Sequence, residues 1–437
     1  MPDKNRTVIH WFRRDLRLND NSALNKALSV GVSVQPVFIF DTQILTKLAD
    51  REDARVTFIY EQLKALNVLL AKYNSAIAVY HDDPLNAWKK IITDFQPEAV
   101  YYNHDYEPYA LERDKKISVF LKTQQIATYS FKDQVIFEKD DLLKADGKPY
   151  TVFTPYKNKW IETLANDNLK NHKVAEQLKN IHPFARQLPD LSALSFTPTK
   201  QKFPNKEYKG VTVDYHDTRN FPALEEGTSH LSIHLRFGTI SVRELIREAL
   251  RLKDKTWLTE LIWREFYMMI LWHYPHTVDH AFKSAYDRIP WRNNEQEFAA
   301  WCKGETGYPL VDAGMRQLNE TGFMHNRVRM VVASFLCKHL LVDWRWGEAY
   351  FARKLQDYEQ SSNVGNWQWA AGCGNDAAPY FRIFNPELQL KKFDPDLVYV
   401  KRWVPEFNDP FRYPMPIVEH KKARERALEI YKNALKN

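Results

Sequence analysis

Short hydrophobic runs alternate with amphipathic stretches in the N-terminal part of the chain. The stretches at 54–73 and 85–95 place apolar residues at helical spacing, whereas each short run fits a buried strand. Strands that alternate with helices predict a doubly wound parallel sheet, and therefore an α/β domain at residues 1–131. The predicted strands are residues 8–12, 34–40, 76–80, 99–102 and 126–131.

The edge of such a sheet beyond the carboxyl ends of its strands is a common ligand site. No G-x-G-x-x-G or P-loop follows any of the predicted strands, so the usual nucleotide fingerprints are absent. The sequence also has no G-x-S-x-G and no H-E-x-x-H motif, and we expect neither a serine hydrolase nor a metal site.

The pattern changes twice after the predicted sheet. Residues 132–210 are rich in proline, lysine and other polar residues, which indicates a linker that wraps the surface. Beyond them apolar residues recur at helical spacing, so residues 211–437 are predicted to form a mostly α-helical domain. The predicted helices are residues 240–252, 257–273, 310–320, 326–341, 346–355 and 419–435.

Composition describes an ordinary globular protein, with 44% hydrophobic and 27% charged residues. We find no apolar run of about 18 residues, and the polar start leads directly into a strand, so we expect neither a membrane span nor a secretory signal. Three widely spaced cysteines predict reduced thiols and a cytoplasmic location. The net charge of +7 permits a polyanionic partner without requiring one.

Tryptophan is unevenly distributed. Ten of the thirteen tryptophans lie between residues 257 and 403, among arginines, carboxylates and amides. Aromatic rings in such company are what a site needs if it holds a flat cofactor and accepts a base taken out of a DNA stack.

Several longer segments resemble those of the photolyase/cryptochrome family, in the same order and spacing over nearly the whole chain, and most closely those of class I cyclobutane pyrimidine dimer photolyases. The segments are VIHWFRRDLRLNDN at 8–21, GTSHLS at 227–232, ELIWREF at 260–266, TGYPLVDA at 306–313, MHNRVRM at 324–330, DWRWGE at 343–348, NWQW at 366–369 and DAAPYFRIFNP at 376–386.

The resemblance implies a U-shaped FAD in the helical domain. His230 stands where the family more typically has arginine or glycine, and Glu359 stands where it more typically has aspartate. The flavin contacts of these two side chains are therefore expected to differ from those of the family. The residues that it implies for the flavin pocket are Tyr215, Thr228, Ser229, Leu231, Ser232, Arg264, Asn326, Arg329, Asp357, Glu359 and Asn363.

Two of these positions have particular roles in the family. Arg329 and Asp357 are expected to form an ion pair beside the isoalloxazine, which is compatible with a purely structural salt bridge as well. Asn363 is expected to face flavin N5, where a neutral amide can bond either redox form. Because plant cryptochromes have an aspartate there, Asn363 favours a repair enzyme.

The resemblance also implies a substrate pocket formed by Glu260, Trp263, Asn326, Met330 and Trp369. The two indoles would form flat walls for linked thymines, at about 1–3 kcal/mol for each stacked base. Glu260 would bond a thymine, best when protonated, and an aromatic pocket is expected to raise its pKa. Enzymes for (6-4) photoproducts carry histidines at the positions of Asn326 and Met330, so this chain is expected to take the cyclobutane dimer.

Trp367, Trp344 and Trp291 match the family's electron-transfer triad, although three indoles in a core would look the same in sequence. Together with Glu260 and Asn363, they are the expected catalytic residues.

DNA is expected to be gripped by Arg219, Arg327 and Arg382, each of which could equally be a surface charge. A second, light-harvesting chromophore is expected on the α/β domain, with Glu112 as a candidate contact. Methenyltetrahydrofolate is favoured over a deazaflavin, and a site without any second chromophore is the other alternative.

The implied function is light-driven repair of cyclobutane pyrimidine dimers in DNA by electron transfer from excited reduced FAD, a carbon–carbon lyase activity. We expect a monomer that binds damaged DNA and needs no obligate protein partner. A cryptochrome that signals through partners is one alternative, but the pocket residues are intact and the chain ends soon after residues 419–435. A flavin oxidoreductase that uses a nicotinamide cofactor is another, which the missing dinucleotide fingerprint disfavours.

Overall fold

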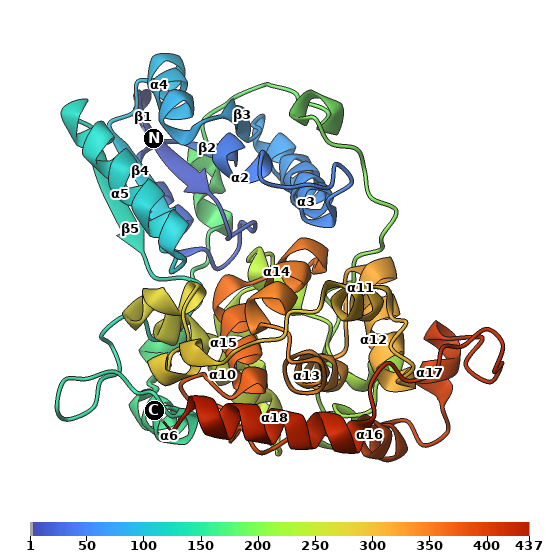
Figure 1. The fold of residues 1–437 in the computed structure, drawn as a ribbon. Coiled ribbons are helices and arrows are strands. Elements are labelled where there is room, and N and C mark those ends of the chain that lie inside the picture. The colour runs from blue at the N-terminus through green and yellow to red at the C-terminus, as the bar shows by residue number, and fades with distance from the viewer. Residues whose placement is uncertain (1–2, 437) are drawn as a thin grey trace. The chain divides into compact units, whose positions relative to one another are not determined.

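The chain forms two compact units that are interleaved along the sequence (Figure 1). The computed structural model describes the backbone of residues 3–436 and the side chains of residues 6–436. The sheet unit extends to Asp141 and also contains Trp160–Lys206 and Leu231–Arg251. The helical unit consists of Leu142–Lys159, Glu207–His230 and the chain from Leu252 onwards. The domain boundaries expected at residues 131 and 210 stay a prediction.

A five-stranded parallel sheet with the strand order β3-β2-β1-β4-β5 is the centre of the sheet unit. Each predicted hydrophobic run coincides with one of these strands, and the expected α/β fold of this part is confirmed. The strands are β1 (Asp3–Phe12), β2 (Val32–Asp41), β3 (Ala78–Asp82), β4 (Ala99–Asn103) and β5 (Ala127–Phe131).

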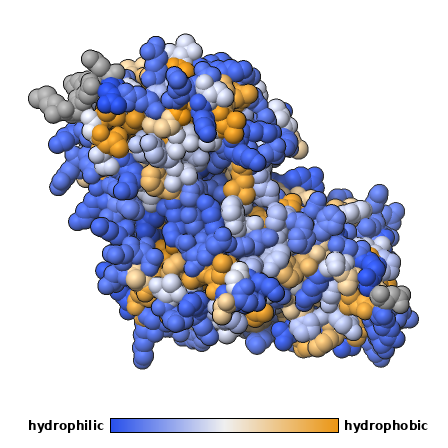
Figure 2. Space-filling model, turned by 90° about the vertical axis from the view of Figure 1, so that its left-hand side faces the viewer, coloured by the Kyte–Doolittle hydropathy of each residue, from blue (hydrophilic) through white to orange (hydrophobic). Residues whose placement is uncertain are grey.

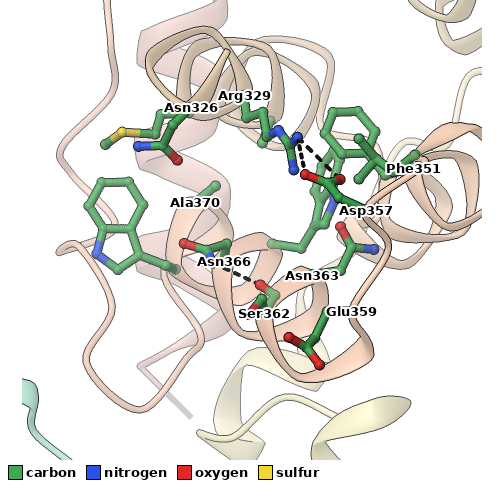
Figure 3. Close-up of a pocket in the computed structure, with 14 residues that line it drawn as sticks. Asn326, Arg329, Phe351, Asp357, Glu359, Ser362, Asn363, Asn366 and Ala370 are labelled. Carbon is green, nitrogen blue, oxygen red and sulfur yellow. Dashed lines mark hydrogen bonds and ion pairs between the residues drawn. The ribbon is translucent and has the colours of Figure 1, made fainter. Parts of the chain in front are cut away.

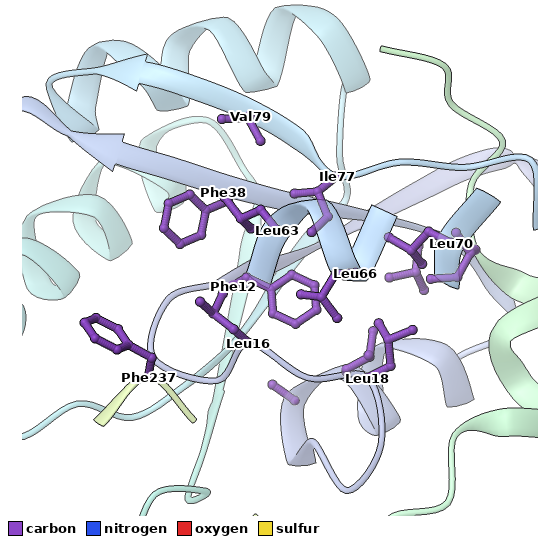
Figure 4. Close-up of a cluster of buried hydrophobic side chains, with 14 of the residues drawn as sticks. Phe12, Leu16, Leu18, Phe38, Leu63, Leu66, Leu70, Ile77, Val79 and Phe237 are labelled. Carbon is purple, nitrogen blue, oxygen red and sulfur yellow. The ribbon is translucent and has the colours of Figure 1, made fainter. Parts of the chain in front are cut away.

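Side-chain alternation along the strands divides the core of this unit into two layers. Val8 and Phe12 of β1 join a cluster with α1 (Ser22–Ser29) and α3 (Ala54–Leu70), which is drawn in Figure 4. Ile9 and Trp11 point to the opposite face and pack with α4 (Pro84–Phe95) and α5 (Pro108–Thr123). Because the side-chain period of a strand is two, one short run supplies both faces of the sheet.

Part of the predicted linker belongs to this core. Ile181 makes an isolated parallel bridge to Val34 of β2, and the His182 N–H donates to the Val34 carbonyl at 2.8 Å. Leu191, Leu194 and Phe196 are buried in the same cluster as α3. The sheet unit also contains several short helices, both in this linker and before it. They are α2 (Thr42–Leu45), Ala71–Tyr73, Asn166–Leu169, Ala175–Asn180 and Leu191–Leu194.

Buried charges fix the loop after β1 to a helix far along the chain. Arg243 belongs to α9 (Val242–Arg251), which follows α8 (Ser232–Arg236). It contacts Asp20 at 3.0 Å and Asp133 at 2.8 Å, and Asp133 also contacts Arg17 at 2.6 Å. Burial alone would raise the pKa of Asp133, but the two guanidinium groups lower it below its usual value. The charged residues of the segment at 8–21 therefore have structural partners inside this unit.

The helical unit agrees with the predicted all-α part, and its helices begin or end within two residues of the predicted limits where a prediction was made. A buried cluster of aromatic and aliphatic side chains forms its core. Its main helices are α10 (Thr256–His273), α11 (Glu295–Lys303), α12 (Pro309–Thr321), α13 (Asn326–Ser334), α14 (Trp344–Lys354), α15 (Gln360–Ala371), α16 (Pro386–Phe393), α17 (Val398–Trp403) and α18 (His420–Ala434).

Shorter pieces connect these helices. They are α7 (Tyr215–Thr218), the 3₁₀ turns Glu225–Gly227, Pro275–Val278 and Ser284–Arg288, and α6 (Phe153–Thr163), of which the residues up to Lys159 belong to this unit. The predicted helix at 326–341 is α13 followed directly by a π-helix at Phe335–Leu340. A π-turn holds one more residue than an α-turn, and it changes which side chains face the core.

Two glycines of the unit allow helices to approach closely. A methyl group at Gly347 of α14 would overlap the ring of Trp367 on α15, and one at Gly365 of α15 would overlap the ring of Tyr267 on α10. Gly372 has a φ of 89° and ends α15 in the left-handed region that favours glycine. The position of α15 between α10 and α14 therefore depends on missing side chains.

A lysine of the π-helix lies inside the unit. The Lys338 ammonium donates to the carbonyl oxygens of Ala371 at 2.8 Å and Tyr380 at 3.3 Å, and it lies 3.8 Å from the centre of the Tyr431 ring on α18. The Tyr431 hydroxyl donates to the same Ala371 carbonyl at 3.0 Å. Burial lowers the pKa of Lys338 to about 7. Two donors thus cap the end of α15 and connect it to α18.

Hydrophilic residues cover most of the face shown in Figure 2, and hydrophobic residues appear there in small separate groups. Among the described residues, no helix is both long and apolar enough to span a bilayer.

Candidate active site

A cavity of about 600 Å³, including space open to solvent, lies between α13, α14 and α15 of the helical unit (Figure 3). The lining residues are Asn326, Arg329, Met330, Ala333, Phe351, Leu355, Asp357, Glu359, Ser362, Asn363, Asn366, Trp367, Trp369 and Ala370.

An ion pair occupies one wall of the cavity. The Arg329 Nη2 atom lies 2.9 Å from Asp357 Oδ2, as the sequence predicted for a pair at these positions. Arg329 Nε also donates to the Met324 carbonyl at 2.7 Å, so the guanidinium is held from two sides. The two charges compensate each other at the wall, and the pair can present both a donor and an acceptor to a bound molecule.

The amide of Asn363 is oriented by a half-buried carboxyl group. Its Nδ2 donates to Glu348 Oε1 at 2.9 Å and to the Glu348 carbonyl at 3.2 Å. Burial raises the pKa of Glu348, while Asn363 and the Tyr358 hydroxyl oppose that shift. Because the amide nitrogen is engaged with Glu348, the amide oxygen is the Asn363 atom left to accept from a bound group.

Arg264 and Glu359, both expected at the flavin, are partners of each other. Arg264 Nε donates to Glu359 Oε2 at 3.1 Å, and both side chains are largely buried. Glu359 lines the cavity at the N-terminus of α15, whereas Arg264 belongs to α10 and is not among the lining residues. The Glu359 side chain, one methylene longer than an aspartate, therefore reaches Arg264 of the neighbouring helix α10.

Three of the expected substrate residues meet at the same cavity. Asn326 and Met330 lie one turn apart on α13, and Trp369 faces them from α15. Helix α13 begins at Asn326 because the preceding His325 ring accepts the Arg327 N–H at 3.2 Å. Burial lowers the pKa of His325 to about 3, which keeps this ring neutral and able to accept.

The other two expected substrate residues are engaged elsewhere. The Trp263 ring stacks on Phe153 of α6, with 3.6 Å between ring centres and 7° between the planes. Glu260 Oε1 lies 2.6 Å from Arg219 Nη1, so a residue expected to bind the base is paired with one expected to bind DNA. Neither Trp263 nor Glu260 is among the lining residues of the cavity.

The three tryptophans of the expected electron path all belong to the core of the helical unit. Trp367 lines the cavity and is buried, Trp344 is buried at the start of α14, and the half-buried Trp291 packs against the same cluster. The Trp367 ring contacts Phe351 at 5.0 Å and Trp301 at 6.1 Å between ring centres. The Trp291 ring lies 5.9 Å from Tyr431.

The remaining expected flavin residues lie outside the lining of this cavity. Tyr215 is half-buried in α7, where burial raises the pKa of its phenol. Thr228 and Ser229 are half-buried in the helical unit, whereas Leu231 and Ser232 belong to the sheet unit, Leu231 buried and Ser232 exposed.

The expected DNA contacts differ in their surroundings. Arg327 donates to Asn220 Oδ1 at 2.7 Å and its guanidinium lies 4.5 Å from the centre of the Phe393 ring. Arg382 is exposed. Glu112, the candidate contact for a second chromophore, is exposed on α5 and pairs with Lys116 at 2.6 Å.

Sequence reasoning missed several residues of the cavity, although a signal for them existed. Glu359, Asn363, Asn366 and Ala370 follow helical spacing along α15, and Asn326, Arg329, Met330 and Ala333 do so along α13. Extending each helical face from the residues already identified would have found Asn366, Ala370 and Ala333. No sequence pattern pointed to Glu348, because it acts on the cavity only through its hydrogen bond with Asn363.

The donor set of the cavity fits an isoalloxazine. The flat and aliphatic side chains of Trp367, Phe351 and Leu355 suit a planar ring, and the Arg329–Asp357 pair with Asn363 supplies donors and acceptors at its edge. Among the described residues there is no group of three or more His, Cys, Asp or Glu side chains that could hold a metal. The three cysteines are free thiols.

Comparison with known proteins agrees with this geometry. The family model for DNA photolyase matches residues 8–177, and that for the FAD binding domain of DNA photolyase matches residues 257–411. The deoxyribodipyrimidine photo-lyase of Synechococcus sp. is 37% identical, over 98% of this chain and 97% of its own length.

Two solved structures share the whole fold. The class III photolyase of Agrobacterium tumefaciens has a TM-score of 0.89 and 34% identity, with 100% of this chain and 99% of that chain covered. The photolyase of Sulfolobus tokodaii, solved with two FAD molecules, has a TM-score of 0.83 and 34% identity, with 98% and 100% covered. The chain, with its FAD-binding domain in the helical unit, therefore belongs to the DNA photolyase family.

Proposed function

We propose that this chain repairs cyclobutane pyrimidine dimers in DNA by light-driven electron transfer from reduced FAD. The observation that carries the proposal is the meeting of two residue sets in one cavity. Arg329, Asp357 and Asn363 can hold a flavin ring, while Asn326, Met330 and Trp369 can hold a base next to it. Electron transfer between cofactor and substrate needs this proximity.

The side chains of α13 support the cyclobutane dimer as the substrate. Asn326 and Met330 offer an amide and an apolar thioether to the base. A histidine at either position would supply a proton donor for other chemistry, and this chain has none there. Trp369, half-buried at the cavity, supplies a flat face that tolerates any pyrimidine pair.

Bound FAD in its reduced form would supply the electron that opens the dimer and would accept it back. The chain's own residues prepare the site for this exchange. The Arg329–Asp357 pair adds no net charge to the wall. Glu348 orients the Asn363 amide so that the amide oxygen can accept a hydrogen bond from a nitrogen that carries a proton. Because no proton has to move for ring opening, the cavity needs no general acid–base pair.

Trp367, Trp344 and Trp291 are proposed to carry electrons from the surface to this cavity. Their burial pattern supports the proposal, since Trp367 lines the cavity, Trp344 is buried in the same core, and Trp291 is partly exposed. Indole is the most easily oxidised side chain that a core of this kind offers in quantity.

A second chromophore is proposed at the sheet unit, with methenyltetrahydrofolate favoured over a deazaflavin. Beyond the end of β1, the guanidinium groups of Arg13 and Arg113 lie 4.9 and 5.1 Å from the centre of the Trp11 ring. The carboxyl edge of a parallel sheet is a common ligand site, and both guanidinium groups are held there by Asp114. The absorption spectrum of the purified protein, with extraction of what it holds, tests this proposal.

We also propose that the protein acts as a monomer in the cytoplasm without an obligate protein partner. Light scattering of the purified FAD-bound protein, alone and with DNA, measures the number of copies in each state.

Repair of a defined lesion tests the proposed function directly. Purified protein with reduced FAD would be mixed with an oligonucleotide that carries one thymine dimer and illuminated with blue light. We expect intact thymines to appear in the light and not in the dark. Bound FAD without any repair would contradict the proposal and favour a signalling role. Repair of a (6-4) photoproduct instead would contradict the substrate.

A further inference from the structure

The indole of Trp263 is supported by a ring from a distant segment of the chain. The Phe153 ring lies 3.6 Å from it, between ring centres, with 7° between the planes, and Phe153 is 5% exposed. Tyr267, one turn further along α10, contacts the same indole at 5.5 Å, a distance at which near-parallel rings are offset. Phe153 therefore covers one face of the indole closely, and a base that stacks on Trp263 takes the other face.

The start of α6 determines where the Phe153 ring lies. Phe153 is the first residue of this helix, and its N–H is one of the groups that an α-helix cannot satisfy internally. Asp376 Oδ2 accepts that N–H at 2.9 Å, although the two residues lie 223 positions apart. A carboxylate at a helix N-terminus also interacts favourably with the helix dipole. Asp376 therefore caps α6 from another part of the chain.

Asp376 belongs to the loop between α15 and α16, residues 372–385, which supports both of the indoles expected at the damaged bases. Phe384 of this loop lies 6.4 Å from the ring of Trp369, with 34° between the planes, and Trp369 lines the cavity. Asp376 reaches Trp263 indirectly, through the residue whose N–H it accepts. One loop thus connects two walls that lie on different helices, α10 and α15.

We propose that Asp376 is a positioning residue for damaged DNA, because it holds Phe153 against Trp263 and so fixes the plane of the indole. The inference rests on the proposed function, since it assumes that a base of the dimer stacks on Trp263. An indole turns about two side-chain bonds, and a ring packed on one face removes much of that freedom before the base arrives. Without Asp376 the first turn of α6 loses its cap, Phe153 moves with that turn, and the base has to order the indole as it binds.

Another bond joins α6 to α10 without touching this contact. The Tyr156 hydroxyl donates to Glu265 Oε1 at 3.2 Å, one turn further into α6. Its removal loosens the packing of the two helices but leaves the Phe153 N–H on Asp376. Tyr156→Phe is therefore the matched control for Asp376→Ala, because it separates general packing of the helix pair from the positioning of the indole.

The ratio of two DNA affinities measures the effect. The FAD-bound protein would be titrated in the dark with an oligonucleotide that carries one thymine dimer and with the undamaged oligonucleotide of the same sequence. Phosphate contacts are common to both, so the ratio isolates the base that leaves the stack. Asp376→Ala should lower this ratio by about 3- to 10-fold, less than the loss of the whole indole. The amount of bound FAD and its absorption spectrum should stay as in the wild-type protein.

Further variants test whether the effect passes through the proposed contacts. Asp376→Asn keeps an oxygen that can accept the Phe153 N–H, so it should keep the wild-type ratio, and so should Tyr156→Phe. Phe153→Leu keeps the cap and removes the ring, so it should lower the ratio as Asp376→Ala does. In a Trp263→Ala background, Asp376→Ala should lower the ratio no further, because the ring that it positions is gone.

A wild-type ratio for Asp376→Ala, or a further drop in the Trp263→Ala background, would overturn the inference. Equal weakening of both oligonucleotides would show that Asp376 only stabilises the fold. If Asp376→Ala does not retain FAD, Phe153→Leu decides, and a wild-type ratio there contradicts the inference equally. Each of these results leaves repair by the wild-type protein intact. A wild-type protein that binds both oligonucleotides equally and repairs neither would overturn the proposed function, and the inference with it.

Discussion

Polar side chains at the cavity are held by one another before any ligand arrives. Arg329 is paired with Asp357, Arg264 with Glu359, and Asn363 with Glu348. Each pair joins residues that lie 15 to 95 positions apart in the chain. Side chains fixed in this way lose little conformational freedom when a ligand binds, which favours affinity and a single bound geometry.

Replacing Trp263 with alanine tests the proposed stacking wall. Trp263→Ala should weaken binding of a dimer-containing oligonucleotide by about 1–3 kcal/mol, or roughly 5- to 150-fold, because a base loses its stacking partner. The loss should be much smaller for undamaged DNA, in which no base leaves the stack. Fluorescence titration with both oligonucleotides gives the two affinities.

Trp257→Phe is the matched control for this change, because Trp257 is a buried indole of the same helix that contacts Tyr208 at 5.5 Å. It should leave the ratio of the two affinities unchanged. Equal weakening of both oligonucleotides by Trp263→Ala would indicate that the ring only supports Phe153 and the fold around it.

The outer end of the proposed electron path can be tested separately from repair. Trp291→Phe should slow photoreduction of the bound flavin, since phenylalanine is far harder to oxidise than tryptophan. Repair by protein that has been reduced chemically beforehand should stay at the wild-type rate. Transient absorption measures the first quantity and an oligonucleotide assay the second.

Trp403→Phe serves as the control, because this tryptophan is half-buried on the outside of the same core. Photoreduction of Trp291→Phe at the wild-type rate would show that electrons enter by another route. The contact of Trp367 with Trp301 is then the first place to look for it.

At the scale of elements, hydrophobic periodicity predicted the strands and helices correctly, but it did not predict which of them are in contact. Hydrophobic spacing predicted the strands and the long helices, because each buries a face whose period is fixed by backbone geometry. It did not reveal the π-helix at Phe335–Leu340, where every side chain is buried and no polar face marks the register. The stack of Phe153 on Trp263 joins segments about 110 residues apart, and no local pattern encodes such a contact.

The π-helix also places a titratable group in the core, with a consequence for stability. Burial lowers the pKa of Lys338 to about 7, whereas in an unfolded chain it is near its ordinary value of about 10.4. Between these values the unfolded chain binds more protons than the folded one. The contribution of Lys338 to the free energy of unfolding should therefore rise with pH, by up to about 1.4 kcal/mol per pH unit.

Lys338→Met removes this titration. The difference in free energy of unfolding between the wild-type protein and Lys338→Met should grow as pH increases from 7 to 9, as measured by urea denaturation at each pH. The exposed Lys391 on α16 offers a control, and Lys391→Met should give a difference that does not change with pH. A pH-independent difference for Lys338→Met would mean that its ammonium is charged throughout this range.

At the scale of the whole molecule, the class of each part was predictable but the assignment of segments to units was not. The parallel sheet follows from alternating strands and helices, and the helical part from its spacing, whereas the strand order came only from the structure. That α9 joins the sheet unit depends on Arg243 meeting Asp20 and Asp133, which are more than 100 residues away. Such pairing of buried charges has no signature in a local pattern.

At the scale of the whole molecule, positive charge also determines how strongly the affinity for DNA depends on salt. Arg382→Gln removes an exposed charge proposed to contact a phosphate, so the slope of log affinity against log salt should fall by about 1. The change should be the same for damaged and undamaged DNA, because phosphate contacts carry no information about the base. Binding measured at several salt concentrations gives the slope.

Arg251→Gln is the control for this experiment, because Arg251 is an exposed charge, paired with Glu248, at the end of α9 in the sheet unit. It should leave the slope unchanged. A slope that Arg382→Gln does not alter would remove Arg382 from the proposed DNA contacts.

The missing side chain at Gly347 limits how this protein can be altered. A side chain at this position would overlap the ring of Trp367, so no substitution of Gly347 should be tolerated, although Gly347 does not line the cavity. Libraries that aim at greater thermal stability commonly replace helical glycines with alanine. In this chain that substitution would move an indole at the cavity wall, so Gly347 should be kept constant.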